Sequence, residues 1–282
     1  MQNEIDIMEK LIGKKYHEIK TDDTGGNSRA YIIDGGKIVF KFPRNDQVTY
    51  DNEIKILQTI NGIRTGVNLQ KVGWLSNDNK YIGLLGVTGK SISCGQLKSE
   101  QKRQIGEKIG IFLKELHKIK TDCVPNLALS EEINAWQKRY LGYKDIITPH
   151  LDTNMRDKLN KLMLEDMPKE LNKLGEDMVF CHGDLGDSNI FINEEKVGII
   201  DFNESGYFDR AADFMDIRDD EILSHMLDSY EADDILRKKV QIRRTIRPVI
   251  ALRCYILKED ESEIKNTINQ IMGVIGNNVL VF

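Results

Sequence analysis

The chain has 282 residues, of which 40% are hydrophobic and 30% charged. This balance excludes a disordered or fibrous chain and predicts one large globular domain or two smaller ones. A formal net charge of -5 argues against a nucleic-acid partner. No apolar run approaches the roughly 20 residues that cross a bilayer. The first residues are polar and acidic, unlike a signal peptide, so we expect no membrane partner.

The first ninety residues predict a strand-rich lobe. Residues 29–42 alternate around the Asp-Gly-Gly sequence at 34–36, and such a turn between β-branched and aromatic runs favours a hairpin. A helix is expected next, because apolar residues recur at helical spacing over 56–60. Residues 81–85 are typical of a further buried strand, and the glycines that follow predict a hinge.

From about residue 99 the pattern becomes helical. Ser99 is a candidate N-cap, and the apolar face of its helix comprises Ile105, Ile109, Phe112, Leu113 and Leu116. Residues 131–175 continue the helical pattern. Two short strands are expected at 191–192 and 197–200, and the remainder to about residue 272 is expected to be helical.

This order of elements predicts an α+β fold. We expect an N-terminal nucleotide-binding lobe over residues 1–88 and a helical, catalytic and substrate-binding lobe over residues 89–282. The default position of a site in such a fold is the cleft between the lobes.

The strongest chemical signal begins at His182. The sequence His-Gly-Asp-Leu-Gly-Asp-Ser-Asn ends at Asn189, and an Asp-Phe pair follows at Asp201 after a predicted strand–turn–strand. Kinases have the same separation in H-x-D-x-x-x-x-N followed by D-F-G. Phosphoryl transfer needs a carboxylate to deprotonate the attacking hydroxyl, which suits Asp184, and oxygen ligands for Mg²⁺, which suit Asn189 and Asp201. The alternative is a structural aspartate in a turn.

A second signal is Lys41. It lies in a predicted strand with its apolar neighbours on the opposite face, so a half-buried ammonium there needs a partner. Glu53 lies on the apolar side of the following helix and offers that partner. Their pairing would hold Lys41 over the phosphates of a nucleotide, whereas the alternative is two separate surface charges.

The third signal is the small-residue sequence Gly25, Gly26, Asn27 and Ser28. Small residues let backbone N–H groups approach phosphates closely. An ordinary loop has the same composition, but its place one hairpin before Lys41 matches the order of kinase motifs.

Together these motifs resemble the aminoglycoside phosphotransferase family, which has a protein-kinase-like two-lobe fold. The segment from His182 to Phe191 is similar to the catalytic loop of 3'-phosphotransferases. Segments 38–43, 52–57 and 112–117 are similar to the 2''-phosphotransferases. The resemblance implies the family and leaves open which hydroxyl is attacked.

The resemblance also implies roles. Asp184 would be the catalytic base, Asn189 and Asp201 would bind Mg²⁺, and Lys41 would contact a phosphate of ATP or GTP. Backbone groups near Leu85 and Val87 would hold the purine. Acidic residues just after the metal motif would meet a polycationic aminoglycoside; these are Glu204, Asp219, Asp220 and Glu221.

One departure from the family pattern is Asn203, which stands where glycine usually follows Asp-Phe. Because asparagine tolerates left-handed backbone better than most residues, we expect the turn to persist. The surrounding residues 201–234 hold 12 Asp or Glu and only two Arg. A run of this kind is usually a solvated face, but here it suggests a cation-binding surface.

We therefore interpret the chain as a Mg²⁺-dependent aminoglycoside kinase that confers antibiotic resistance. Its four cysteines lie far apart without a C-x-x-C pair, which favours reduced thiols and a cytoplasmic location. We expect a monomer. One alternative is a metabolic kinase of the same fold that acts on choline, an amino sugar or another antibiotic. Another is a degenerate kinase fold that only binds nucleotide.

Overall fold

The computed structural model describes residues 2–16, 18–23, 28–45, 47–78, 80–94, 96–122 and 124–276. The chain divides into two compact units, and each is built from several stretches of sequence. The first unit comprises Met1–Val124, His182–Ser205 and Ile217–Tyr230, and the second comprises Pro125–Cys181, Gly206–Asp216 and Glu231–Phe282. The lobe boundary predicted after residue 88 lies inside the first unit, and the division of roles at that residue stays a prediction.

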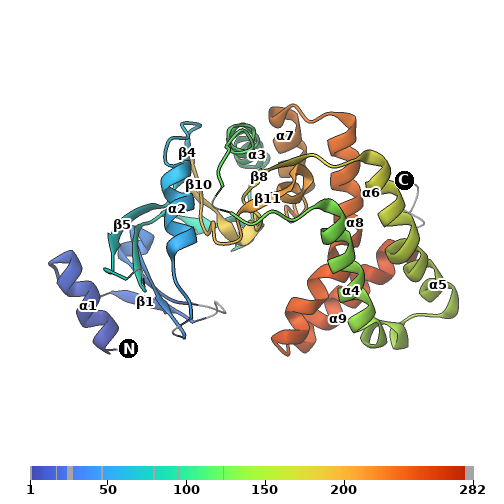
Figure 1. The fold of residues 1–282 in the computed structure, drawn as a ribbon, viewed down its shortest axis with the longest axis horizontal. Helices are drawn as coiled ribbons and strands as arrows, with labels where there is room; N and C mark the ends of the chain where they lie inside the picture. Colours follow the sequence, from blue (N-terminus) through green and yellow to red (C-terminus); the bar gives the residue numbers. More distant parts are fainter. Residues whose placement is uncertain are drawn as a thin grey trace. The chain divides into compact units, whose positions relative to one another are not determined.

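The first unit contains a five-stranded antiparallel sheet in the order β1-β2-β3-β6-β5. Its strands are β1 Ile19–Asp22, β2 Ser28–Ile33, β3 Ile38–Pro43, β5 Lys71–Leu75 and β6 Ile82–Leu85. The predicted hairpin is confirmed, because Ile33 lies opposite Ile38 across a turn at Asp34–Gly36. Helix α1, Gln2–Ile12, packs on this sheet with Met8, and helix α2, Asp51–Ile60, contacts β5 (Figure 1).

A second sheet in the same unit has the order β4-β10-β9-β7. Its strands are β4 Val67–Leu69, β7 Lys90–Ser91, β9 Ile190–Asn193 and β10 Lys196–Ile199. Strands β9 and β10 form the hairpin predicted after the catalytic motif. Strand β4 runs parallel to β10, with Leu69 opposite Ile199. The residues that follow these two strands therefore lie at the same end of the sheet, beyond the C-terminal ends of β4 and β10.

Helices α3, Ser99–Leu116, and α7, Asp220–Tyr230, pack closely in the first unit. The predicted apolar face of α3 is confirmed as buried. The predicted N-cap is wrong by one residue: Lys98 occupies that position, and its backbone N–H donates to the side chain of Gln101. The Gln101 side chain thus supplies an acceptor for the backbone N–H at the start of the helix.

The second unit is mainly helical, as predicted for residues 131–175 and for the C-terminal part. Its helices are α4 Leu129–Ile147, η3 Thr148–His150, α5 Thr153–Lys161, the π-helical η4 Leu162–Asp166, α6 Met167–Leu174, η6 Arg210–Phe214, α8 Asp234–Leu257 and α9 Glu261–Gly276. They enclose an apolar core to which α4, α8 and α9 contribute. No helix in the described ranges is long and apolar enough to cross a membrane.

The expectation of helix throughout residues 201–272 is wrong at one place. Residues Gly206–Asp209 form strand β11, which pairs antiparallel with β8, Met178–Cys181. A four-residue strand carries little periodicity, so its partner strand decides its conformation. Asp209, the last residue of this strand, is buried, and its carboxylate lies 2.5 Å from Lys239 Nζ of α8.

The close packing of α3 on α7 depends on Gly110. A Cβ atom there would lie 2.3 Å from the carbonyl oxygen of Met226 and 2.7 Å from Ser229 Oγ. Alanine is the better helix former by about 1 kcal/mol, but a backbone atom cannot give way as a flexible side chain can. We therefore expect Gly110→Ala to lower the free energy of unfolding by about 1–3 kcal/mol.

Gly142 of α4 is the matched control, because nothing lies within 4 Å of a Cβ built there. Gly142→Ala should raise the free energy of unfolding by roughly 0.5–1 kcal/mol. Urea unfolding of both variants measures the difference. Stabilisation by Gly110→Ala would contradict the packing described for α3 and α7.

Candidate active site

Lys41 stands at the centre of the candidate site. Strand β3 alternates, so Phe40 and Phe42 enter the core beneath α1 while Lys41 projects from the other face. Its Nζ lies 2.6 Å from Glu53 Oε1 of α2 and 3.0 Å from Asp201 Oδ1. The predicted pairing of Lys41 with Glu53 is therefore confirmed, and Asp201 joins it. A strand, the helix that follows it and a residue 160 positions further along the chain meet at one ammonium group.

Burial sets the protonation of this cluster. The Lys41 and Glu53 side chains are 11% and 1% exposed. Burial alone would lower the pKa of Lys41, but the charges of Glu53 and Asp201 outweigh it and raise that pKa. Burial raises the pKa of Glu53, and the lysine offsets only part of this effect. Among the described residues nothing donates to Glu53 Oε2. The charge of Glu53 is thus tolerated only because Lys41 faces it.

Asp201 has an unusual backbone. Its φ is 66°, in the left-handed region, which costs a residue with a side chain roughly 1–2 kcal/mol. Its N–H donates to Gln70 Oε1 over 3.1 Å, and its Oδ1 accepts from Asn203 Nδ2 over 2.7 Å as well as from Lys41. The expected turn persists: the Ser205 N–H donates to the Phe202 carbonyl oxygen over 3.2 Å, with Asn203 between them, although Asn203 does not adopt the left-handed conformation. The left-handed residue is Asp201, which precedes this turn, and Asn203 contacts its carboxylate.

The predicted base, Asp184, lies in an exposed loop after β8. The side-chain amide of Asn189 donates to Asp184 Oδ2 over 3.0 Å and to its carbonyl oxygen over 2.8 Å. The Asp184 N–H donates to His182 Nδ1 over 3.2 Å. His182 is fully buried, and its Nε2 lies 3.0 Å from the Ile200 carbonyl oxygen. Because Nδ1 accepts, the imidazole is neutral with its proton on Nε2, which donates to that carbonyl.

The two predicted metal ligands flank the same hairpin: Asn189 directly precedes β9, and Asp201 follows β10. The Ile200 N–H donates to the Asn189 carbonyl oxygen over 3.0 Å, so Asp201 follows directly after the residue that faces Asn189. The Asn189 amide nitrogen is bound to Asp184, which leaves the amide oxygen for a cation. An amide oxygen and a carboxylate are the ligand types that Mg²⁺ takes, together with water and phosphate oxygens. The donor set therefore fits Mg²⁺.

The residues predicted to bind the nucleotide are only partly described. Gly25, Gly26 and Asn27 lie outside the described residues. Ser28 begins β2, and its Oγ lies 2.8 Å from the hydroxyl of the buried Tyr50. Leu85 ends β6 with 46% of its surface exposed, whereas Val87 is buried. Gly86 between them lies close to the β2–β3 turn, because its N–H donates to the Lys37 carbonyl oxygen over 2.8 Å.

The predicted substrate-binding acids differ in how they are engaged. Lys102 Nζ lies 2.8 Å from Asp219 and 3.3 Å from Glu221. The Asp219 carboxylate also accepts from the first N–H groups of α7. Glu204 and Asp220 are exposed. The Arg218 N–H donates to Asp187 of the catalytic loop over 3.3 Å, which brings the start of α7 to that loop.

The acidic run at 201–234 is not contained in one unit. It is divided between the two units, and several of its carboxylates pair with a base of their own unit. In the second unit Asp209 pairs with Lys239, Asp233 with Arg210, and Asp216 with Arg247. Paired carboxylates contribute less to a field than unpaired ones, and Asp219 and Glu221 of the first unit are likewise compensated by Lys102.

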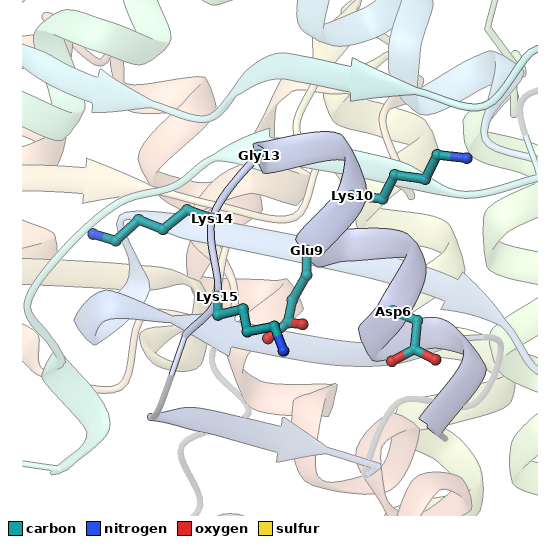
Figure 2. Close-up of a pocket in the computed structure, with 6 residues that line it drawn as sticks. All are labelled: Asp6, Glu9, Lys10, Gly13, Lys14 and Lys15. Carbon is teal, nitrogen blue, oxygen red and sulfur yellow. The ribbon is translucent and has the colours of Figure 1, made fainter.

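A hollow of about 400 Å³ beside α1 lies apart from these residues. It is lined by Asp6, Glu9, Lys10, Gly13, Lys14 and Lys15, and none of the predicted site residues contributes to it. Figure 2 shows Lys10 and Lys14 extending in opposite directions. Side chains that diverge in this way do not converge on a ligand, so the candidate site remains the cluster around Lys41 and Asp184.

Comparison with known proteins decides the family. The chain matches the phosphotransferase enzyme family over residues 18–241. It belongs to this family. A 53-residue segment is 49% identical to an aminoglycoside 3'-phosphotransferase of Enterococcus faecalis, covering 16% of this chain and 20% of that protein. The match therefore spans about a fifth of that relative's length.

Solved structures establish the fold. The GDP and kanamycin complex of APH(2")-IIia has a TM-score of 0.79 and 20% identity, covering 99% of this chain and 100% of that one. A macrolide 2'-phosphotransferase type I has a TM-score of 0.66 and 15% identity, covering 96% and 97%. The predicted α+β, protein-kinase-like fold and the resemblance to aminoglycoside phosphotransferases are confirmed.

Sequence reasoning missed two contributors to the site. Gln70 follows a strand of only three residues, and no local pattern connects it with Asp201. The orientation of His182 depends on Ile200, eighteen residues away. Asn203 also contributes, through its contact with the Asp201 carboxylate. Its departure from the usual glycine marks the position in the sequence but does not predict that contact.

The buried ion pair gives a stability prediction. Lys41→Met removes the ammonium and leaves the Glu53 charge buried without a partner, so the free energy of unfolding should fall by about 3–5 kcal/mol at neutral pH. Lys41→Met/Glu53→Met replaces both charges by apolar groups and should recover most of the loss. Chemical unfolding of wild type, both single variants and the double variant measures the coupling.

The pH dependence follows from the raised pKa of Glu53. A carboxyl whose folded pKa exceeds its unfolded value, about 4.3, contributes its full stabilisation below that unfolded value. Its contribution is lost as the pH rises through the folded pKa. The deficit of Lys41→Met should therefore be smaller at pH 5 than at pH 8. Equal deficits at both values would mean that Glu53 is not a buried, unpaired charge in this variant.

Proposed function

We propose that the chain transfers the γ-phosphate of a nucleoside triphosphate to a hydroxyl of an aminoglycoside, and that it thereby confers antibiotic resistance. One observation carries the proposal. Within a single compact unit, Lys41 joins Glu53 and Asp201, and the adjoining hairpin holds Asp184 beside Asn189. This combination of groups serves phosphoryl transfer in kinases, and the chain belongs to the phosphotransferase enzyme family.

In this proposal Asp184 is the base. Its carboxylate is exposed, while Asn189 holds one of its oxygens and the His182 ring accepts from its backbone N–H. These bonds fix the direction of the carboxylate, so that an incoming hydroxyl can give up its proton as it attacks the γ-phosphorus. Orientation of this kind accounts for much of the catalysis in phosphoryl transfer.

Three residues would bind the phosphates of the nucleotide: Lys41 directly, and Asn189 and Asp201 through a metal ion. The raised pKa of Lys41 keeps its charge, and a phosphate oxygen that enters would replace part of its contact with Asp201. The Asn189 amide oxygen and the Asp201 carboxylate would hold Mg²⁺. A divalent ion held there would supply positive charge to neutralise the phosphates during transfer. Ser28, Leu85 and Val87, together with the residues Gly25, Gly26 and Asn27 of the sequence motif, are proposed to hold the nucleotide.

The aminoglycoside is proposed as substrate on two grounds. The relatives that share sequence and fold include an aminoglycoside 3'-phosphotransferase and a kanamycin complex. The exposed acids Glu204 and Asp220 also suit a polycation better than a neutral molecule. A macrolide phosphotransferase has the same fold, so fold alone does not choose the antibiotic. We further propose a cytoplasmic monomer, consistent with the buried, unpaired thiol of Cys181.

A substrate panel tests the proposal. The purified protein is incubated with Mg²⁺ and either ATP or GTP, together with kanamycin, gentamicin, streptomycin, a macrolide, choline or glucosamine. Nucleotide consumption is coupled to a spectrophotometric readout, and mass and NMR spectra identify the product. We expect a phosphorylated aminoglycoside. Turnover of choline or a macrolide alone would replace the proposed substrate, and nucleotide binding without any turnover would favour a binding module.

Asp184→Asn tests the base. Asparagine keeps the size of the side chain but cannot accept the proton, so kcat should fall by about 10²–10⁴-fold. Affinity for nucleotide, measured by calorimetry, should change little because Asp184 is not proposed to contact it. A kcat close to that of the wild type would remove Asp184 from this role.

The exposed acids give a prediction about substrate affinity. Glu204→Gln and Asp220→Asn should each raise KM for an aminoglycoside by about threefold to tenfold and leave KM for nucleotide unchanged. The substrate KM should also rise with salt, because the Debye length shrinks to about 8 Å at physiological ionic strength.

Asp228 is the matched control, since it is an exposed acid near the other end of α7. Asp228→Asn should leave KM for the aminoglycoside within about twofold. An α-helix rises roughly 1.5 Å per residue, so Asp228 lies well beyond the first turn of α7. Equal effects of all three variants would indicate a diffuse field rather than recognition at the start of α7.

A further inference from the structure

The conformation of Asp201 depends on two amide side chains. Gln70 Oε1 accepts from the Asp201 N–H, and Asn203 Nδ2 donates to Asp201 Oδ1. Only Gln70 is buried, with 4% of its surface exposed, whereas Asn203 is exposed. One amide therefore fixes the backbone from inside the first unit, and the other fixes the carboxylate from its surface.

The topology explains why Gln70 reaches Asp201 across 131 positions of sequence. Strands β4 and β10 are parallel, and their last residues, Leu69 and Ile199, lie opposite each other. Gln70 is the next residue after β4, and Asp201 is the second after β10. The N–H of a left-handed residue at a strand end has no place in the ladder, and the Gln70 side chain supplies its acceptor.

The carboxylate is constrained as well. Its Oδ1 accepts from both Lys41 Nζ and Asn203 Nδ2. Among the described residues no donor reaches Oδ2, and the side chain is 41% exposed. An oxygen that receives two donors is a poor ligand for a cation, so Oδ2 is the oxygen left to bind one.

We propose that Gln70 is a positioning residue that, together with Asn203, holds Asp201 so that Oδ2 faces the bound divalent cation. This inference rests on the proposed function, because it concerns how that site binds Mg²⁺ with a nucleotide. Gln70 contacts neither the cation nor the substrate; it acts through the backbone of Asp201.

Gln70→Met tests the backbone half. Methionine keeps the length and shape of the side chain but offers no oxygen acceptor. Calorimetry gives the affinity for the non-hydrolysable nucleotide AMP-PNP with Mg²⁺ and, separately, in EDTA. The ratio of the two affinities is the magnesium gain. We expect Gln70→Met to reduce this gain about tenfold, the effect of losing one buried hydrogen bond, and to leave the affinity in EDTA within about twofold.

Two further variants complete the design. Asn203→Ala changes an exposed residue and so spares the fold; it should reduce the gain about threefold, since a second donor still holds Oδ1. Gln104→Met is the matched control, because its amide donates to Glu100 on α3 and has no contact with Asp201. It should keep the full gain. Hydrogen exchange of peptides that contain Asp201 should be faster in Gln70→Met than in Gln104→Met.

The outcomes separate the two proposals. A full magnesium gain in both Gln70→Met and Asn203→Ala would overturn this inference and leave the proposed function intact. If hydrogen exchange of the peptides that contain Asp201 is as slow in Gln70→Met as in the wild type, the role of Gln70 is overturned. This measurement does not depend on whether the protein binds a nucleotide. A wild-type protein with no magnesium gain would overturn the proposed function and this inference together.

Discussion

The ammonium group of Lys41 is the contact on which the candidate site depends. It is nearly buried, and it is compensated by two carboxylates, Glu53 from α2 and Asp201 from the end of a hairpin. A buried charge requires partners of opposite sign. The ion pairs of Lys41 therefore connect strand β3 with helix α2 and with the end of the β9–β10 hairpin.

The remainder of the site extends from this contact through backbone geometry. Asp201 follows the hairpin in which Ile200 is bonded to Asn189, and Asn189 holds Asp184. Each group is fixed by a neighbour that is itself fixed, as a preorganised site requires. The strained conformation of Asp201 fits this view, since a left-handed residue persists only where its surroundings determine it. Here those surroundings are Gln70 and Asn203.

Charge in the acidic run serves different purposes in its different parts. In the second unit Asp209 contributes to a buried cluster in which Lys239 faces it and Arg243 lies 3.6 Å away. Arg243 in turn makes a bidentate contact with Glu132. Such carboxylates stabilise the fold of their unit only as members of a paired network. In the first unit Glu204 and Asp220 are exposed, as their proposed role toward a cationic substrate requires.

The sequence by itself determined the residues whose partners follow from local pattern. The alternation around Lys41 and the helical face of Glu53 predicted their pairing, and the spacing from Asp184 to Asn189 and Asp201 identified the predicted catalytic loop and hairpin. Hydrophobic periodicity also predicted α3 and the helical second unit, because these signals extend over many residues.

Only the tertiary structure decided the contacts made by short or distant segments. The bond from Asp201 to Gln70 requires the parallel pairing of β4 with β10, and β11 requires β8. Strands of three or four residues carry too little periodicity to predict such pairings. The left-handed conformation occurs at Asp201, where hydrogen bonds with Gln70, Asn203 and Lys41 offset its strain. Those partners come together only when the chain has folded.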